Sequence, residues 1–195
     1  MYNVRQAIIK TLGVSSLAVC FYATAGVAQD NPVEITQPTG QEQSFRGYLT
    51  GYSVWDTTPA TIPELSHSRR QELAGGVGTY SNPITLAVAG VLQGYETVLD
   101  IPAGTRFYLP RLRKYAIIED ICGDISNTQD AGCAAGKDGL PWLEIYIDGI
   151  GMEEETAGCA KKISRIQTFV MDPAPNHSVV VGEITQSGCN TYPDL

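Results

Sequence analysis

The chain has 195 residues, enough for one domain with a hydrophobic core and too few for two domains of ordinary size. It carries 21 acidic and 13 basic residues, a formal net charge of −8 at pH 7. Nucleic acids and anionic membrane surfaces would repel such a surface, so we expect neither as a partner.

The first 28 residues have the layout of a secretory signal peptide. Arg5 and Lys10 give a basic start, residues 11–22 are apolar, and small residues lead to Ala28, after which we expect cleavage. The apolar stretch is shorter than the about 20 residues that span a bilayer, so we expect a secreted protein without membrane contact after cleavage. The mature chain would keep 11 of the 13 basic residues and all 21 acidic ones, a charge of −10.

Residues 29–45 are polar, contain prolines and lack periodicity, which predicts a flexible leader before a domain spanning residues 46–195. The first strand is predicted over residues 46–55, where Tyr and Thr alternate with smaller or apolar residues. A long insertion follows, in which residues 64–73 are predicted to form one or two helical turns. His67 lies in this insertion, where a surface histidine is most often simply polar.

Further short strands are predicted over residues 83–91 and 96–101, followed by a strand-like run over residues 105–121. That run ends on Glu119 and Asp120. An acid at the end of a buried strand is costly unless it is paired, hydrogen-bonded or in use. The many short strands predict an all-β fold, and about six strands around one small core suit a closed barrel.

Residues 125–141 are predicted to form a loop, and the strand over residues 142–148 follows it. Alternation places Leu143, Ile145 and Ile147 on one face of this strand. The other face carries two acids and two aromatic rings: Trp142, Glu144, Tyr146 and Asp148.

The remaining chain is predicted to hold a solvated turn and two strands. The acidic run Glu153, Glu154 and Glu155 suits a turn. Residues 164–171 have the pattern of the last barrel strand, and residues 179–184 have that of an edge strand.

Four cysteines follow the predicted cleavage site, which in an exported chain indicates two disulfides with three possible pairings. We favour a bridge between Cys122 and Cys133, which would brace the loop after Asp120. The second bridge would then join Cys159 to Cys189 and tie the tail to the domain. No pair of cysteines has the spacing of a zinc site, and we expect no metal and no cofactor.

Several of these segments are similar to a known superfamily. They are the Pro102-Ala103-Gly104-Thr105 turn before an aromatic strand, the strand that ends at Asp120, and the strand that contains Glu144. Over about residues 48–170 the chain resembles the three-aspartate domain of the double-psi β-barrel superfamily, which includes lytic transglycosylases, rare-lipoprotein-A-like wall proteins, expansins and family 45 endoglucanases. The resemblance implies a six-stranded double-psi β-barrel, here with long disulfide-braced loops.

The resemblance also implies a polysaccharide-binding groove. Asp120 matches one of the three family aspartates, Glu144 stands where the family has its acid catalyst, and near Ala89 and Gly90 the chain has no acid. Tyr52 matches a groove aromatic. We therefore expect a catalytic pair of Glu144 and Asp120, and substrate-binding residues that comprise Tyr52, Trp142, Tyr146 and Asp124.

Three functions remain open from the sequence. A proton donor and a second carboxylate are what glycoside cleavage generally requires, so the chain could cut peptidoglycan or another cell-wall glycan. It could instead bind or loosen the polysaccharide without cutting it, as expansins do. The third function is an extracellular inhibitor or effector that uses its loops to hold another protein. In each case we expect a monomer.

Overall fold

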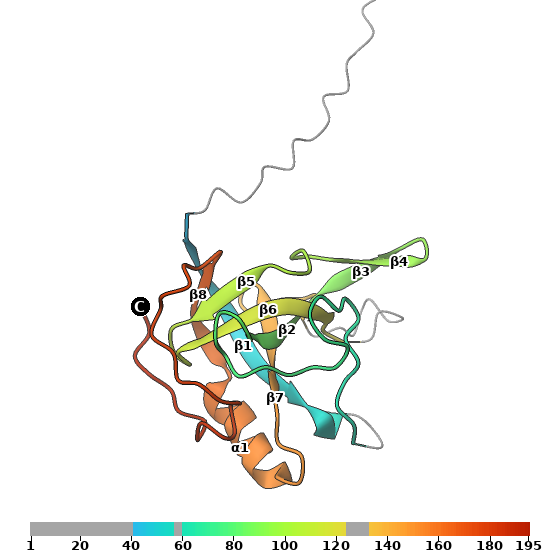
Figure 1. Ribbon diagram of the computed structural model, residues 1–195. Helices are drawn as coiled ribbons and strands as arrows, with labels where there is room; N and C mark the ends of the chain where they lie inside the picture. Colours follow the sequence, from blue (N-terminus) through green and yellow to red (C-terminus); the bar gives the residue numbers. More distant parts are fainter. Residues whose placement is uncertain (1–40, 57–59, 124–132) are drawn as a thin grey trace, which may run out of the picture. The chain divides into compact units, whose positions relative to one another are not determined.

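The computed structural model describes residues 41–56, 60–123 and 133–195. Six strands form a closed barrel in the order β1-β7-β2-β6-β5-β8, which confirms the prediction of an all-β, six-stranded barrel (Figure 1). The barrel strands are β1 (Gln43–Ser53), β2 (Ile84–Val88), β5 (Arg106–Leu109), β6 (Lys114–Ile121), β7 (Trp142–Ile147) and β8 (Arg165–Met171). The other described elements are the hairpin of β3 (Gly90–Gln93) and β4 (Glu96–Leu99), the short helix η1 (Val54–Asp56) and the helix α1 (Glu153–Ile163).

The barrel combines two parallel strand pairs with antiparallel ones. β1 runs parallel to β7, and β2 runs parallel to β6. β2 and β7 are antiparallel neighbours and join the two parallel pairs into one four-stranded wall. This wall positions the candidate site, because residues that face one another across it project to the same side.

The interior of the barrel is filled by aliphatic and aromatic side chains. Leu143 and Ile145 are completely buried, as the alternation of β7 predicts. Phe45 stacks on Phe169 with ring centroids 5.4 Å apart and meets Phe107 edge-on at 5.9 Å. These ring contacts explain why β1 begins at Gln43, three residues before the predicted start.

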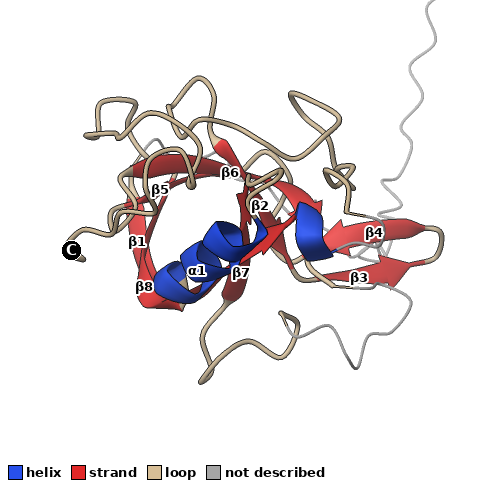
Figure 2. Cartoon of the chain, turned by 90° about the horizontal axis from the view of Figure 1, so that it is seen from below, coloured by secondary structure: helices blue, strands red, loops and turns tan. Residues whose placement is uncertain are grey.

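α1 was not expected, because the sequence predicted a solvated turn at Glu153–Glu155. These acids form the first turn of the helix, where they complement its dipole. Thr156, Cys159 and Ile163 are buried on one face, with the i, i+3, i+7 spacing of an amphipathic helix. Figure 2 shows α1 lying across one end of the barrel. The prediction of a turn was wrong because only three buried residues mark this helix.

Two other predicted elements were also wrong. Residues 64–73 form no helix; the main chain pairs in antiparallel fashion between Glu64 and Leu73 because Leu65 is drawn into the core. Residues 179–184 form no edge strand. There the backbone makes isolated hydrogen bonds, such as Val180 N–H to Arg113 O at 3.0 Å, and buried Lys114 donates to nearby carbonyls.

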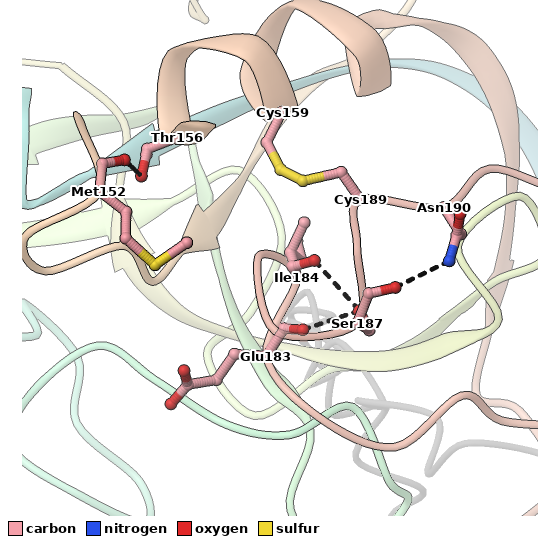
Figure 3. Close-up of a disulfide and its surroundings, with 8 residues drawn as sticks. All are labelled: Met152, Thr156, Cys159, Glu183, Ile184, Ser187, Cys189 and Asn190. Atoms are coloured by element: carbon pink, nitrogen blue, oxygen red, sulfur yellow. Dashed lines mark hydrogen bonds between the residues drawn. A yellow bond between two sulfur atoms is a disulfide. The ribbon is translucent and has the colours of Figure 1, made fainter. Parts of the chain in front are cut away.

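Both favoured disulfides are present. The Cα atoms of Cys122 and Cys133 are 6.1 Å apart, and those of Cys159 and Cys189 are 5.5 Å apart. The second bridge joins α1 to the C-terminal segment (Figure 3). Beside it, Ser187 Oγ donates to the Glu183 carbonyl at 2.7 Å, which fixes a turn of that segment. Disulfides are typical of proteins outside the cytosol, and no helix in the described part of the chain is long and apolar enough to span a membrane.

Candidate functional site

A row of four residues crosses the outer face of the wall. Thr50 of β1 faces Glu144 of β7, Glu144 faces Ala87 of β2, and Ala87 faces Asp120 of β6. Leu86 and Ile145, the residues next to Ala87 and Glu144 in their strands, are in the core, so this row points outward. The two predicted carboxylates therefore lie on one side of the barrel, separated by the small side chain of Ala87.

A β-bulge brings Asp120 to this face. β2 and β6 pair Leu86 with Ile118, and the next pair is Ala87 with Asp120, so Glu119 is an extra residue. A bulge locally changes which side of a strand its residues face. Without the shift, Asp120 would share the inward face of Ile118.

Glu144 is half-buried, and its surroundings fix one of its two oxygens. The Trp142 indole N–H donates to Thr50 Oγ1 at 2.7 Å, and Thr50 Oγ1 donates to Glu144 Oε1 at 2.9 Å. Because an indole N–H can only donate, the Thr50 hydroxyl must direct its own hydrogen to the carboxyl group. Among the described residues, none donates a hydrogen bond to Glu144 Oε2.

The environment of Glu144 favours its protonated form. A carboxyl oxygen of Glu144 and the sulfur atoms of Cys122 and Cys133 all lie within 4.8 Å of one another. Burial raises the pKa of Glu144, the Thr50 hydrogen bond lowers it, and the charges of Asp56 and Asp120 raise it. The net direction is upward, as is typical of a carboxyl group that acts as an acid.

Within the described residues, this cluster of Glu144 and two cysteines is the one group of three or more His, Cys, Asp or Glu side chains whose ligand atoms lie close enough together to hold a metal ion. Both sulfur atoms belong to a disulfide and offer no thiolate ligand. The cluster therefore does not fit a metal centre.

Asp120 is only 6% exposed and has three hydrogen-bond donors. Its Oδ1 accepts from the backbone N–H of Ser66 at 3.2 Å and of Ile121 at 2.9 Å. Its Oδ2 accepts from the Tyr52 hydroxyl at 3.1 Å. Both carboxylate oxygens are thus engaged, and Asp120 holds other groups in place.

The aromatic residues divide into accessible and buried ones. Tyr52 is half-buried, and burial, followed by the charge of Asp120, raises its pKa well above the ordinary value, so it remains a donor. Its ring meets that of Tyr146 edge-on at 5.5 Å. Tyr146 is only 2% exposed, so its ring is not an open surface for a ligand. Trp142 is half-buried and meets Tyr48 edge-on at 5.1 Å.

Two hollows are lined by aromatic residues that contact the row, and the described lining of neither includes Glu144 or Asp120. One has a volume of about 410 Å³ and is lined by Trp142, Ala89 and Cys133, among others. The second, of about 300 Å³, lies between β1 and α1 and is lined by Tyr52 and Trp55, among others. Trp142 and Tyr52 thus each form part of a concave surface next to the carboxylate row.

Some features of the site could not be read from the sequence. Thr50 lies two residues before Tyr52 in the same strand, so the sequence could have placed both on one face. The hydrogen bond from Thr50 to Glu144, however, depends on the pairing of β1 with β7. Ser66 comes from the insertion and carried no signal. The next residue, His67, bonds through its ring to Ser66 Oγ and to the Thr97 carbonyl, both at 3.0 Å, which ties the insertion to the β4 strand. Asp124 lies outside the described residues.

Next to Asp120, Glu119 forms a buried ion pair with Arg70 of the insertion. Its carboxylate is completely buried, and Oε2 lies 2.8 Å from Arg70 Nη2. The buried acid at the end of this strand thus has an opposite charge next to it, as burial of a carboxylate requires. The pair fixes the insertion against the same wall that carries Asp120.

Comparison with known proteins gives a family but no described activity. Residues 44–190 match the family described as "DDB_G0273701 N-terminal domain". A relative from Dictyostelium discoideum, named "Uncharacterized protein DDB_G0273701/DDB_G0273221", is 28% identical over 139 residues. The match covers 71% of this chain and 55% of the relative, so the chain spans about half the length of that protein. No solved structure matches the chain.

Proposed function

The chain belongs to the DDB_G0273701 N-terminal domain family, and from this premise we propose that it is an exported polysaccharide-binding barrel of the double-psi class. In this proposal its ligand is a cell-wall glycan, and Glu144 donates a proton to the glycosidic oxygen. The observation that carries the proposal is the half-buried Glu144, which has one oxygen fixed by Thr50 and lies in the same outward row as Asp120.

The arrangement of the barrel supports the double-psi assignment. The two parallel pairs, β1 with β7 and β2 with β6, are joined through the antiparallel contact of β2 and β7. The Pro102–Thr105 turn leads into β5, with Thr105 Oγ1 donating to the Pro102 carbonyl at 2.7 Å. Gly104 in this turn has φ +93°, a conformation that favours glycine.

Glu144 has the properties that a general acid needs. Its raised pKa keeps a proton on the carboxyl group at a higher pH than an exposed glutamate would. With Oε1 accepting from Thr50, the proton resides on Oε2. When that proton passes to the glycosidic oxygen, the C–O bond to the leaving sugar weakens, and the Thr50 hydrogen bond stabilises the carboxylate that remains.

Asp120 has a supporting role in this scheme. Its negative charge raises the pKa of Glu144, and it fixes the Tyr52 hydroxyl and the Ser66 backbone. Because its two oxygens already accept three hydrogen bonds, Asp120 is poorly suited to activate water. Cleavage would then use Glu144 as donor and, after donation, as the base that accepts a proton from the attacking hydroxyl.

The test compares the wild type with Glu144→Gln on insoluble peptidoglycan, cellulose and chitin. Glutamine keeps an oxygen for Thr50 but cannot donate the proton, so we expect sugar release to fall about 100-fold or more while pull-down is unchanged. Glu155→Gln, on the exposed side of α1, is the matched control and should behave as the wild type. Product formation should also decline as the pH rises through the raised pKa of Glu144.

The engagement of Asp120 by three donors favours a second candidate, a module that binds or loosens a glycan without cutting it. Under this alternative the wild type binds a polysaccharide and neither protein releases sugar, which would refute Glu144 as an acid. Failure to bind any of the three glycans would refute the polysaccharide proposal as a whole. Capture of a defined protein partner in that case would support the inhibitor class.

A further inference from the structure

We propose that Asp148 and Glu183 bind a divalent cation of the calcium type in the hollow beside Tyr146. The site joins the end of β7 to the C-terminal segment. It shares no carboxylate with the proposed glycan site, and nothing in its support depends on glycan binding.

The two carboxyl groups come from rigid parts of the chain. Asp148 directly follows β7, on the outward face of that strand. Glu183 lies in the segment held by the Cys159–Cys189 bridge, and Figure 3 shows its carboxylate pointing away from that bridge. The neighbouring Ile184 is only 1% exposed and anchors the segment in the core.

Asp148 and Glu183 lie within hydrogen-bonding reach of one another, and both line an open hollow of about 490 Å³. Two carboxylates this close repel each other unless a proton or a cation lies between them. Glu72 lines the same hollow, and its described lining includes no Lys, Arg or His. The hollow therefore lacks a positive charge to match its acids.

A third group has no partner of its own. The Tyr146 hydroxyl is buried and makes no hydrogen bond in the described part of the chain, although Tyr146 lines this hollow. Burial and, after it, the charges of Asp148 and Glu183 raise the pKa of this hydroxyl. An unpaired buried hydroxyl costs about 1–3 kcal/mol. A cation, or one of the water molecules bound to it, would supply the missing partner.

The chemistry of this donor set indicates a hard cation. Carboxylate and hydroxyl oxygens suit calcium or magnesium, and calcium tolerates an irregular, open site with several bound water molecules better than magnesium does. Two protein carboxylates give modest affinity, and we expect a Kd of about 10⁻⁴–10⁻³ M, the range of extracellular calcium modules.

Calorimetric titration of the whole protein with calcium chloride at pH 8 tests the proposal. At this pH the carboxyl group of Glu183 is ionised, because its pKa is raised to about 7 by burial and by Asp148. We expect one saturable site and a rise in Tm of about 4 °C at ten times Kd. Terbium, titrated as a second probe, should show emission sensitised by Tyr146.

Variants distinguish the proposed cation site from binding elsewhere on the protein and from misfolding. Asp148→Asn and Glu183→Gln should each weaken calcium binding at least tenfold, and Tyr146→Phe should reduce terbium emission. Glu155→Gln is the control and should bind as the wild type. The two site variants lose a mutual repulsion, so their Tm in chelator should equal or exceed that of the wild type, which excludes misfolding as the cause.

Two outcomes would overturn the proposal. Absence of saturable calcium binding by the wild type would refute the cation site. Binding that survives in Glu183→Gln would place the cation elsewhere. Since no glycan is present in these experiments, they fail or succeed independently of the polysaccharide proposal.

Discussion

Loss of the Arg70 charge should destabilise the barrel strongly, because it leaves Glu119 buried without a counter-ion. Glu119 is 0% exposed, and its Oε2 lies 2.8 Å from Arg70 Nη2. Removing one partner of a buried ion pair costs about 3–5 kcal/mol. The Arg70 side chain is 19% exposed, so water can reach the orphaned carboxylate through the vacated space. We therefore expect Arg70→Met to cost about 3 kcal/mol, near the lower end of that range.

Urea unfolding at pH 7 and pH 5 measures this effect. In Arg70→Met the buried carboxylate has lost its counter-ion, so burial favours the neutral carboxyl group in the folded state. The variant therefore gains stability as the pH falls, and its deficit relative to the wild type should be smaller at pH 5. A deficit of about 3 kcal/mol corresponds to a Tm lower by about 6–12 °C.

The neighbouring Arg69 provides the control, because it is exposed. Arg69→Met should change stability by no more than about 0.5 kcal/mol. In the double variant Arg70→Met with Glu119→Gln, no charge is buried, and much of the lost stability should return. Equal stability of Arg70→Met and Arg69→Met, or a deficit that does not change between pH 7 and pH 5, would refute the reasoning.

Three further outcomes follow from the described contacts. Burial and Asp148 raise the pKa of Glu183 to about 7, so the stability that comes from its bound proton is lost as the pH rises through 7. The Tm measured in chelator should therefore fall between pH 5 and pH 8, and Glu183→Gln should flatten this profile. Burial lowers the pKa of Lys114 from 10.5 to about 8, so between these pH values the unfolded state binds more protons than the folded state. Stability measured by urea unfolding should therefore rise with pH in that window, and Lys114→Met should abolish the rise. Replacing Cys122 and Cys133 with Ala opens a bridge of sequence separation 11 and should cost about 3 kcal/mol in denaturant unfolding; an unchanged midpoint would mean that the loop is equally restricted without it.

The sequence predicted those parts of the barrel whose pattern is local. β7 was placed to within one residue because Leu143, Ile145 and Ile147 alternate with polar and aromatic residues, and this period belongs to strands alone. β5 begins one residue after the start of the run predicted over residues 105–121, since a Pro-Gly turn precedes it, and it ends before Pro110. α1 was missed because Gly158 and a mostly polar surface leave little helical signal.

The arrangement of the candidate site depended on information that a sequence does not contain. The β-bulge at Glu119 decides that Asp120 faces outward beside Glu144, and no residue pattern marks it. The engagement of Asp120 depends on Ser66, which the insertion brings from a distant part of the chain. The resemblance to a known superfamily indicated which two acids to compare. Only the structure shows that both oxygens of Asp120 accept hydrogen bonds, whereas Glu144 accepts one at Oε1 alone within the described residues.

The bridge between Cys122 and Cys133 determines when the surroundings of Glu144 become complete. Its sulfur atoms lie within 4.8 Å of a carboxyl oxygen of Glu144, so the bridge forms part of the surroundings of this acid. Such a bond forms by oxidation and is rare where thiols are kept reduced. A newly made chain in a reducing compartment would therefore carry Glu144 in a looser setting, and arrival in an oxidising environment would complete the pocket.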